Sequence, residues 1–544
     1  MKKLKPVLNT LTFVFPLYPT LLLLYPIFLG IFIDYDLFDS RCLAISLVWI
    51  PLFTIPAILT KKKYILRVST LLFFLVGLIE TCHWIILGGP ITITITSLLV
   101  ISNTYYDEIV EFASLKASSE LLLLLPFLAI FILSFKNYPP FIRTKIKNYT
   151  LLTIGLICVI FISENAINGR LIRKGSPHLI KVAYSFIEKI SLFKEAMKDA
   201  NPKEVEANSI IPNEKQTFVL ILGESNSRRH MSLYGAKSKT TPKLDDRTDL
   251  ILYNNVVSPY SSTINSVLTI LTQTNLEKKI DILKNIDILD VFHSSGFKNF
   301  WISNQSPIGV WDNQITQFAR KSDRCEFVNM TSNSSYEATY TASYDEKIIA
   351  PFSEALQDSA KKKLIILHLI GNHSSYSKRY PTNFNIFEGD GSKKSNTIAE
   401  YKNSLVYTDF IVDSMINVLI KSQRSNTNTA TSLLYISDHG ENVYDHGEKA
   451  GHDYSKVVPK ANVEIPFFLW ISPYFQSLDS SKTQQTILNK NKPFVTDDLF
   501  HALIDLNFIK TKFLEKGRSV FNPIFNDKRK RILCDGKDYD EKVD

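Results

Sequence analysis

Long apolar stretches are confined to the first third of the chain, and the rest alternates short apolar runs with polar segments. The long stretches occupy residues 11–33, 42–60, 68–88, 119–135 and 149–166. Each is near the roughly 20 residues that a helix needs to cross a bilayer, and the fourth is the shortest. The pattern predicts an α-helical membrane domain with five transmembrane helices over residues 1–168.

Basic residues flank these stretches asymmetrically. They precede the first stretch and follow the second and the fourth, at Lys2, Lys3, Lys5, Lys61, Lys62, Lys63, Arg67, Lys136, Arg143, Lys145 and Lys147. The positive-inside rule then predicts a cytoplasmic N-terminus and places everything after residue 168 outside. A cleaved signal peptide is the main alternative for the first stretch. With 23 residues, three prolines and no small-residue cleavage site after it, we interpret it as a retained span.

Residues 169–213 form a predicted linker of mixed polarity. Within it, "LIKVAYSFIEKISLFKEAM" carries apolar residues at the i, i+3, i+4 spacing of an amphipathic helix. Two interpretations stay open: a helix that packs on the following domain, or an interfacial helix on the membrane surface.

From about residue 214 the pattern changes to that of a folded α/β domain. The segments "TFVLILG", "LILYNNVV", "NFWIS", "LIILHLI", "SLLYIS" and "IPFFLWIS" are short and mostly unalternating, as strands buried on both faces are. They predict a mostly parallel sheet covered by helices over residues 214–544. Ligands of such sheets bind beyond the carboxyl ends of the strands, so the residues following each run are the candidate functional residues.

Three of these strand ends carry polar groups that suit a metal. Glu224 follows the first run, Asp438 and His439 follow "SLLYIS", and Ser258, Ser261, Ser262 and Thr263 follow "LILYNNVV" before a helical stretch. One divalent cation held by Glu, Asp and His would leave a position for a hydroxyl oxygen. A helix N-terminus also binds phosphate, and a metal can make Ser or Thr nucleophilic. The alternative for Ser262 or Thr263 is simple helix capping.

Histidines are concentrated near the same strand ends. Five of the ten follow or lie in two predicted strands: His368, His373, His439, His446 and His452. Such imidazoles could bind a substrate phosphate, protonate a leaving alkoxide or hold a second metal. His368, inside an apolar strand, fits a hydrogen-bonded core histidine better.

Composition narrows the class of protein further. With 21% charged residues and 45% hydrophobic residues, the chain is not a disordered one. Its net charge is +9, but the basic residues lie around the apolar stretches, so this charge does not indicate a nucleic-acid partner. Five cysteines exclude a disulfide-framework protein, and only Cys325 and Cys534 lie outside apolar runs as a candidate disulfide pair.

Several ordered blocks resemble one known family. They are "LILGESNSRRHMSLYG" with "TTPKLDD", "NVVSPYSSTINSVLTILT", "FWISNQ", "LHLIGNHSSYSKRYP" and "SDHGENVYDHGEKAGHDY". Together they resemble the membrane-bound phosphoethanolamine transferases of the alkaline phosphatase/sulfatase superfamily. The resemblance covers the whole chain and implies five spans in the bacterial inner membrane followed by a periplasmic catalytic domain. "SPYSSTIN" is closer to the branch acting on lipopolysaccharide core heptose than to the lipid A branch.

The resemblance also implies the chemistry. It implies a Zn²⁺ site made from Glu224, Thr263, Asp438 and His439, with Thr263 as the nucleophile and with phosphatidylethanolamine and a lipopolysaccharide glycolipid as donor and acceptor. His373 and His452 match family histidines that contact phosphate or help to bind a second zinc. Ser261 is the alternative nucleophile. His446 has no firm counterpart.

The membrane part adds one candidate by resemblance and two by position. Glu108, in "NTYYDEIVEF", matches a family segment and is a candidate contact to substrate or a second metal, with an ordinary solvated acid as the alternative. Glu80 and His83 lie inside the third stretch, where ionisable groups usually face protein or water. We interpret them as bundle-packing residues, with a contact to the donor lipid as the alternative.

Three other functions are alternatives to phosphoethanolamine transfer. A glycerol phosphate transferase using phosphatidylglycerol to modify a periplasmic glucan or a teichoic acid-like polymer would keep the same metal residues. A sulfatase is disfavoured because the Cys/Ser-x-Pro-x-Arg segment is absent around Thr263. A non-enzymatic receptor with a degenerate ectodomain is disfavoured by the intact Glu224, Thr263, Asp438 and His439.

Overall fold

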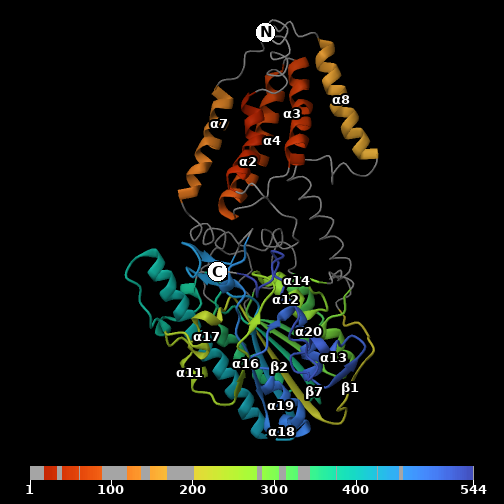
Figure 1. Ribbon diagram of the computed structural model, residues 1–544, viewed down its shortest axis with the longest axis vertical. Helices are drawn as coiled ribbons and strands as arrows, with labels where there is room; N and C mark the ends of the chain where they lie inside the picture. The colour runs from red at the N-terminus through yellow and green to blue at the C-terminus, as the bar shows by residue number, and fades with distance from the viewer. Residues whose placement is uncertain are drawn as a thin grey trace. The chain divides into compact units, whose positions relative to one another are not determined.

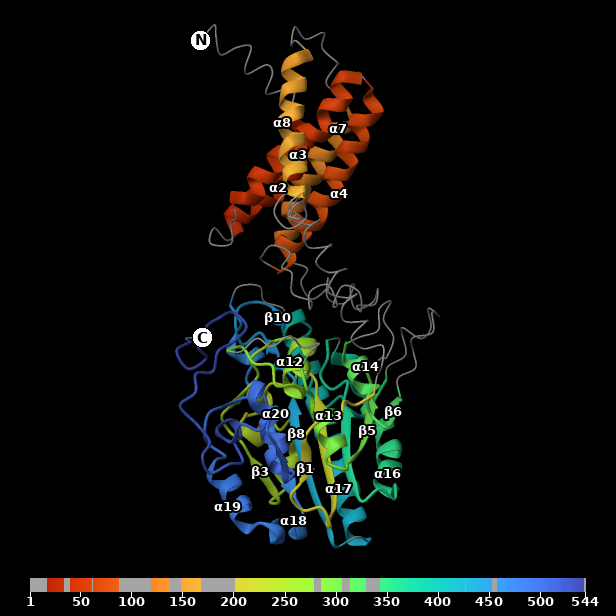
Figure 2. The same cartoon turned by 90° about the vertical axis from the view of Figure 1, so that its right-hand side faces the viewer.

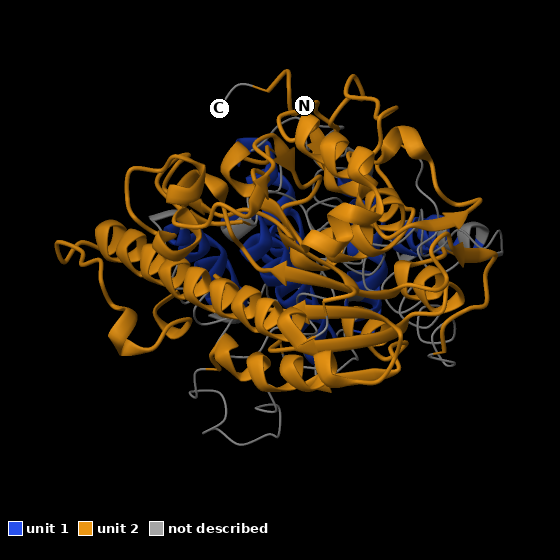
Figure 3. Ribbon diagram, turned by 90° about the horizontal axis from the view of Figure 1, so that it is seen from below, with its two compact units in different colours: residues 1–98, 116–194 blue, residues 99–115, 195–544 orange. Residues whose placement is uncertain are grey.

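The computed structural model divides the chain into two compact units (Figure 3). The first comprises Met1–Leu98 and Lys116–Lys194, and the second Leu99–Leu115 and Glu195–Asp544. The structure describes residues 17–33, 40–60, 62–87, 119–136, 148–167, 201–277, 285–305, 314–328, 343–374, 376–425, 427–452 and 457–542. Most of the predicted linker and Glu108 lie outside the described residues, so the amphipathic helix and the role of Glu108 stay predictions.

The described part of the first unit is helical (Figure 1). Its helices are α2 (Leu17–Ile33), α3 (Ser40–Thr60), α4 (Lys63–Leu87), α7 (Leu124–Lys136) preceded by the 3₁₀ turn η2 (Ser119–Leu123), and α8 (Asn148–Ile167). Leu22, Phe73 and Phe127 are buried where α2, α4 and α7 pack. A side chain at Gly77 would meet the Leu22 carbonyl oxygen at 2.2 Å, so this glycine permits the close approach of α4 to α2.

An apolar helix occupies each of the five predicted positions. Among the described residues, the stretch Tyr64–Ile85 of α4 is the one that is long and apolar enough to cross a membrane. The apolar parts of the other four helices are shorter: Leu17–Ile33, Cys42–Ala57, Leu121–Ser134 and Leu151–Phe161. The five-span topology therefore stays a prediction.

The second unit is built on a seven-stranded sheet with the order β3-β11-β8-β2-β7-β5-β6. Its strands are β2 (Lys215–Gly223), β3 (Leu250–Leu252), β5 (Lys298–Ser303), β6 (Arg324–Phe327), β7 (Lys362–His368), β8 (Thr429–Ser437) and β11 (Phe467–Ile471). The pairings from β8 through β2, β7 and β5 to β6 are parallel. The sheet is therefore mostly parallel, as expected, and it is mixed because at one edge β11 runs antiparallel to both β8 and β3.

Two strand predictions need correction. The segment "LILYNNVV" is two strands, because β3 ends at Leu252 and β4 (Val256–Val257) pairs with β12 (Phe494–Val495) in a separate two-stranded sheet. Asn254 and Asn255 between them bond the 490–494 segment through their backbone, which bends the chain away from the main sheet. The edge strand β6 was not predicted, since its half-buried sequence "RCEF" lacks an apolar run.

Helices cover both faces of the sheet (Figure 2). On one face, α16 (Ile349–Gln357) and α17 (Lys393–Ser425) bury alternate strand side chains such as Val219, Ile365 and Leu433. On the other face, α13 (Ile288–Ser294) brings Phe292 against Phe218 of β2 with ring centroids 6.0 Å apart. Further elements complete the unit: α11 (Pro242–Asp245), α12 (Thr263–Leu271), α14 (Gln314–Ala319), α18 (Pro473–Leu478), α19 (Ser480–Leu488), α20 (Leu499–Leu506), β1 (Ala207–Ser209) paired with β13 (Ile509–Thr511), and β9 (Asn442–Val443) paired with β10 (Ala450–Gly451).

The candidate disulfide is absent from the structure. Cys325 lies in the edge strand β6 and Cys534 near the C-terminus, and both are free thiols. The two cysteines come from elements that do not pair with each other. Their positions along the chain alone did not reveal this.

Candidate metal and phosphoryl-transfer site

The carboxyl ends of three adjacent strands bring the predicted residues together. Glu224 directly follows β2, Asp438 and His439 follow β8, and His373 lies five residues beyond the end of β7. Because β7, β2 and β8 are parallel neighbours in the sheet, these residues emerge at the same edge. Glu224, Asp438 and His439 are fully buried and form the floor of the site, whereas His373 is half-buried.

A strained turn after β2 holds the acids in place. Ser225 has φ = 54°, a left-handed conformation that is costly for a residue with a side chain. Its amide N–H donates to Asp438 Oδ1 at 3.1 Å, and its hydroxyl donates to Glu224 Oε1 at 2.7 Å. Gly371, with φ = +49°, packs on the same turn, where a Cβ would lie 2.9 Å from the backbone N and O of Glu224.

Thr263 is the first residue of α12 and faces these acids. Its Oγ1 lies 3.2 and 3.1 Å from the two carboxylate oxygens of Glu224, and 3.3 Å from His439 Nε2. Ser262 is the N-cap residue of this helix but makes no side-chain capping bond. Helix capping therefore does not account for the Thr263 hydroxyl, which bonds the acid and the imidazole instead.

Charges in the site influence one another strongly. Burial and the charge of Glu224 raise the pKa of Asp438 to about 7. Burial opposes a charge on His439, but Asp438 and Glu224 outweigh it and raise the pKa of His439 to about 10. Burial likewise opposes a charge on Glu224, yet the hydrogen bond and charge of His439, helped by His373, hold the pKa of Glu224 well below its usual range. Two acids around one imidazole make this a site that attracts a cation.

The donor set fits one divalent metal ion. Ligand atoms of Glu224, Asp438 and His439 lie within 4.8 Å of one another. Asp438 Oδ2 is buried and has no hydrogen-bond partner, which is costly unless a cation binds there. Carboxylate oxygens, an imidazole nitrogen and a nearby hydroxyl are ligands that Zn²⁺ accepts in tetrahedral sites.

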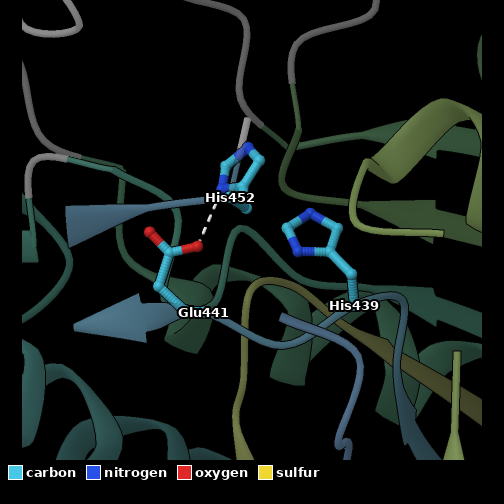
Figure 4. Close-up of side chains that lie close together, drawn as sticks. All are labelled: His439, Glu441 and His452. Atoms are coloured by element: carbon cyan, nitrogen blue, oxygen red, sulfur yellow. Dashed lines mark hydrogen bonds and ion pairs between the residues drawn. The ribbon is translucent and has the colours of Figure 1, made fainter. Parts of the chain in front are cut away.

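A second group of ligand atoms adjoins the first (Figure 4). His439, Glu441 and His452 present ligand atoms within 4.8 Å of one another. His452 Nδ1 lies 2.7 Å from Glu441 Oε2, and the rings of His439 and His452 have centroids 4.4 Å apart. Tyr376 donates its hydroxyl to Glu441 Oε1 at 2.5 Å. His452 is thus close enough to bind a phosphate or a second ion beside the first group.

Other candidate residues lie in different surroundings. His368 is buried, its Nδ1 is 3.2 Å from Ser303 Oγ and its ring packs on Trp301, as expected of a core histidine. His446 is exposed and belongs to neither group of ligand atoms found among the described residues. The backbone of Ser261 lies beside the Cys534 thiol. Glu80 and His83 are half-buried on α4, and their roles stay predictions.

Sequence reasoning did not single out two residues that touch the site. Gln305, two residues after β5, donates from Nε2 to Glu224 Oε2 at 3.0 Å and to the Leu369 carbonyl at 3.1 Å. Its place after a strand is the signal that could have identified it. Glu441, two residues after His439, is buried and holds His452, a pairing that depends on the turn between β9 and β10.

Comparisons with known proteins identify the family of this chain. The family model described as Sulfatase matches residues 216–507. The phosphoethanolamine transferase EptC of Escherichia coli (strain K12) is 29% identical over 516 residues, covering 89% of this chain and 87% of that protein. The C-terminal periplasmic domain of EptC from Escherichia coli, in complex with Zn, has a TM-score of 0.55 and 31% identity over 63% of this chain and 97% of that one.

The integral membrane protein lipooligosaccharide phosphoethanolamine transferase A from Neisseria meningitidis shares the fold over both units. It covers 93% of this chain and 96% of its own, with a TM-score of 0.61 and 19% identity. The family model spans more than half of the chain and includes every strand of the main sheet. The chain therefore belongs to the sulfatase family, and the similar proteins named above are phosphoethanolamine transferases.

Proposed function

We propose that the protein transfers phosphoethanolamine from phosphatidylethanolamine to a lipopolysaccharide acceptor, either core heptose or lipid A, and releases diacylglycerol. The observation that carries this proposal is the Thr263 hydroxyl, held 3.1 to 3.3 Å from Glu224 and His439 at the carboxyl ends of β2 and β8. The match to EptC over 89% of the chain supports ethanolamine as the transferred headgroup.

Glu224, Thr263, Asp438 and His439 would hold one Zn²⁺. The orphaned Asp438 Oδ2 and the Zn complex of the similar EptC domain support this assignment. When bound, the ion would lower the pKa of the Thr263 hydroxyl and withdraw charge from the phosphoryl oxygens. The His439, Glu441 and His452 group would take a second ion or the substrate phosphate.

The transfer would proceed in two displacements at phosphorus. Thr263 Oγ attacks the donor phosphorus, so an O–P bond to threonine forms while the bond to the diacylglycerol oxygen breaks. Glu224 and His439 hold the Thr263 hydroxyl in place, and its proton leaves to solvent, since the bound ion would lower the pKa of this hydroxyl. An acceptor hydroxyl or phosphate then attacks phosphothreonine, which forms the product ester and regenerates Thr263.

His373 and His452 would transfer protons to the leaving oxygen and from the attacking oxygen. Both are half-buried, so they line the open side of the site, whereas the acids and His439 form its closed floor. Protonation of the diacylglycerol alkoxide by an imidazolium would complete the first displacement, and the resulting neutral imidazole would accept the acceptor proton in the second. Glu441 orients the His452 ring through Nδ1.

We further propose that residues 1–168 anchor the protein in the inner membrane by five spans, with residues 169–213 as linker and 214–544 as periplasmic catalytic domain. The five apolar helices and the shared fold with an integral membrane transferase support this placement. A membrane anchor would confine the enzyme to the surface that contains both the lipid donor and a nascent glycolipid.

Intact mass spectrometry of the full-length protein in detergent, incubated with Zn²⁺ and phosphatidylethanolamine, tests the proposal. Wild type should gain the mass of one phosphoethanolamine group, and Thr263→Ala should gain none. Ser261→Ala is the matched control and should keep the adduct. An adduct that survives Thr263→Ala and disappears in Ser261→Ala would move the nucleophile to Ser261.

Phosphatidylglycerol in a parallel incubation tests the alternative donor. A glycerol phosphate adduct formed in preference to phosphoethanolamine would make the protein a glycerol phosphate transferase. Absence of any adduct in zinc-loaded wild type with both lipids would contradict a covalent transfer mechanism.

A further inference from the structure

A row of polar side chains crosses the sheet at the amino ends of its strands, away from the site described above. The parallel register aligns Lys298 of β5 with Lys363 of β7, Lys363 with Thr217 of β2, and Thr217 with Thr431 of β8. All four side chains project to the face covered by α16 and α17, because the buried residues two positions further along these strands pack on those helices. Three of the four have polar partners within the protein: Lys298 binds Asp358 Oδ2, Lys363 donates to backbone carbonyl oxygens, and Thr431 donates to Gln423 Oε1.

A cavity opens beside this row. It has a volume of about 250 Å³, and its lining includes Lys215, Lys361, Lys363, Thr217 and Thr431 together with the end of α17 at Ser422 and Gln423. The end of α16 and the loop after it, over residues 356–361, form one wall. The strand residues that line it belong to the amino ends of β2, β7 and β8. Figure 2 shows α18 at that end of the sheet and α12 at the opposite end.

The lysine at the back of the cavity is fixed in position. Lys363 is only 8% exposed, and its ammonium donates to the carbonyl oxygens of Leu356 at 2.6 Å and Asp358 at 2.9 Å. An ammonium has three N–H donors, so one remains for a ligand. The neutral hydroxyl of Thr217, its neighbour in the sheet, is buried and also lines the cavity.

Positive charge in the cavity exceeds negative charge. Three lysines line it against one carboxylate, Asp358, whose Oδ2 already binds Lys298 at 2.7 Å. Among the described residues, the ammonium groups of Lys215 and Lys361 have no hydrogen bond or ion pair, and both side chains are exposed. Burial lowers the pKa of Lys363, and the charges of Lys215 and Lys298 lower it further despite Asp358.

We propose that this cavity is a second, non-catalytic binding site that takes a phosphate-class oxyanion, either free phosphate or the phosphate group of a monoester. Lys215, Lys361 and Lys363 surround a space large enough for a tetrahedral anion with waters. A doubly charged anion there would offset the repulsion among the lysines and accept charge-assisted hydrogen bonds from them. Chloride, with a single charge and no fixed geometry, would gain less.

Isothermal titration calorimetry of the full-length protein in detergent tests the site, with sodium phosphate as the probe at constant ionic strength. The protein is first stripped of metal, which removes phosphate binding to an ion at Glu224, Asp438 and His439; any phosphate held by His373 or His452 is the same in every variant below, because these residues are not altered. Wild type should show saturable binding of one phosphate. The double variant Lys215→Ala/Lys361→Ala should bind at least about tenfold more weakly, because two charged donors are lost.

Lys490→Ala/Lys510→Ala is the matched control. It removes two exposed positive charges outside the cavity and should bind phosphate as wild type does. Glucose 6-phosphate as a second probe separates the two sources: binding equal to phosphate indicates a monoester site, and binding of phosphate alone indicates a free anion. Equal weakening in both double variants, or no saturable heat in wild type, would overturn the proposal.

Discussion

The Lys321 ammonium and the Asp438 carboxylate are both buried in the second unit, but the groups around them are balanced differently. Lys321 binds Asp287 Oδ2 at 2.5 Å and Asp290 Oδ1. The remaining carboxylate oxygens accept the backbone N–H groups of Asp290 and Asp287 at 3.1 Å each in the capping box of α13. Every carboxylate oxygen of this group has a donor, so the group needs no ligand to complete its hydrogen bonds.

Around Asp438 the acceptors outnumber the donors. Glu224 receives hydrogen bonds from Ser225, Gln305 and Thr263, but Asp438 Oδ2 receives none. A cation bound at Asp438 Oδ2 would offset the cost of this arrangement. Buried acids with a missing donor thus mark a ligand site, whereas buried acids with every donor present mark a structural one.

The largest effect is expected from removing the Thr263 hydroxyl. Thr263→Ala should lower transfer activity by more than about a thousandfold, because the nucleophile is lost. The free energy of unfolding should change by less than about 1 kcal/mol, since Thr263 is only half-buried. Headgroup transfer assays and thermal unfolding in detergent measure the two quantities. A stability loss as large as the activity loss would make Thr263 a structural residue.

For the buried group of Lys321, Asp287 and Asp290 we expect a large loss of stability and no loss of zinc affinity. Lys321→Ala should lower the free energy of unfolding by about 3 kcal/mol, because it leaves Asp287 and Asp290 buried without their cation. The fraction that stays folded should keep its zinc affinity. Lys239→Ala is the control, since its ion pair with Asp245 is exposed and contributes less than about 1 kcal/mol. Equal effects of the two changes would remove the distinction.

Replacing a buried aspartate by asparagine should distinguish an acid that binds metal from an acid that only stabilises the fold. Asp438→Asn should weaken Zn²⁺ binding at least about tenfold, because one ligand is replaced by a poorer one. Without metal its stability should stay within about 1 kcal/mol of wild type, since Asp438 Oδ2 accepts no hydrogen bond there and gives up only the ion pair with His439 Nε2 at 3.4 Å. Zinc titration and unfolding of the metal-free protein measure both.

Asp409→Asn is the matched substitution. Both oxygens of Asp409 accept backbone N–H groups, from Lys243 and Leu244, at 2.9 Å. An amide nitrogen cannot accept, so this variant should lose about 1 to 3 kcal/mol of stability and keep zinc affinity. Weaker zinc binding in Asp409→Asn would contradict the separation of the two roles.

A further difference between the two groups concerns the dependence of stability on pH. Burial and the charge of Asp290 raise the pKa of Asp287 to about 6, from an ordinary value of 3.8. The folded protein then binds a proton between about pH 4 and pH 6 that the unfolded chain does not, so this group lowers stability as pH rises through that range. Asp287→Asn should lack this slope. Unfolding of both proteins from pH 4 to pH 7 measures the difference, and parallel curves would contradict it.

The order of residues along the chain was enough to locate much of the site. Glu224, Asp438 and His439 each follow an apolar run, and parallel strands necessarily bring such residues to one edge. The position of Thr263 at the start of a helix followed from the apolar stretch after it, and α12 begins there. The prediction that His368 is a core histidine is confirmed for a similar local reason, since this residue lies inside an apolar strand.

Other features depend on contacts between distant segments. Gln305 binds Glu224 across 81 positions of the chain, and no local pattern encodes that pairing. The split of "LILYNNVV" into β3 and β4 depends on β12, more than 200 residues later, and the antiparallel edge depends on how β11 returns to β8. The candidate Cys325–Cys534 pair failed because the fold places both as free thiols.

The sequence by itself determined the apolar helices, the α/β character of the second unit, its family and the residue types available for a metal. These follow from periodicity and from local order, which each segment carries within itself. Only the tertiary structure decided that Asp438 Oδ2 has no donor while Asp287 and Asp290 have all of theirs, and that three lysines face one cavity at the other end of the strands. Hydrogen-bond satisfaction and charge balance are sums over neighbours from the whole chain, so they exist only once the chain has folded.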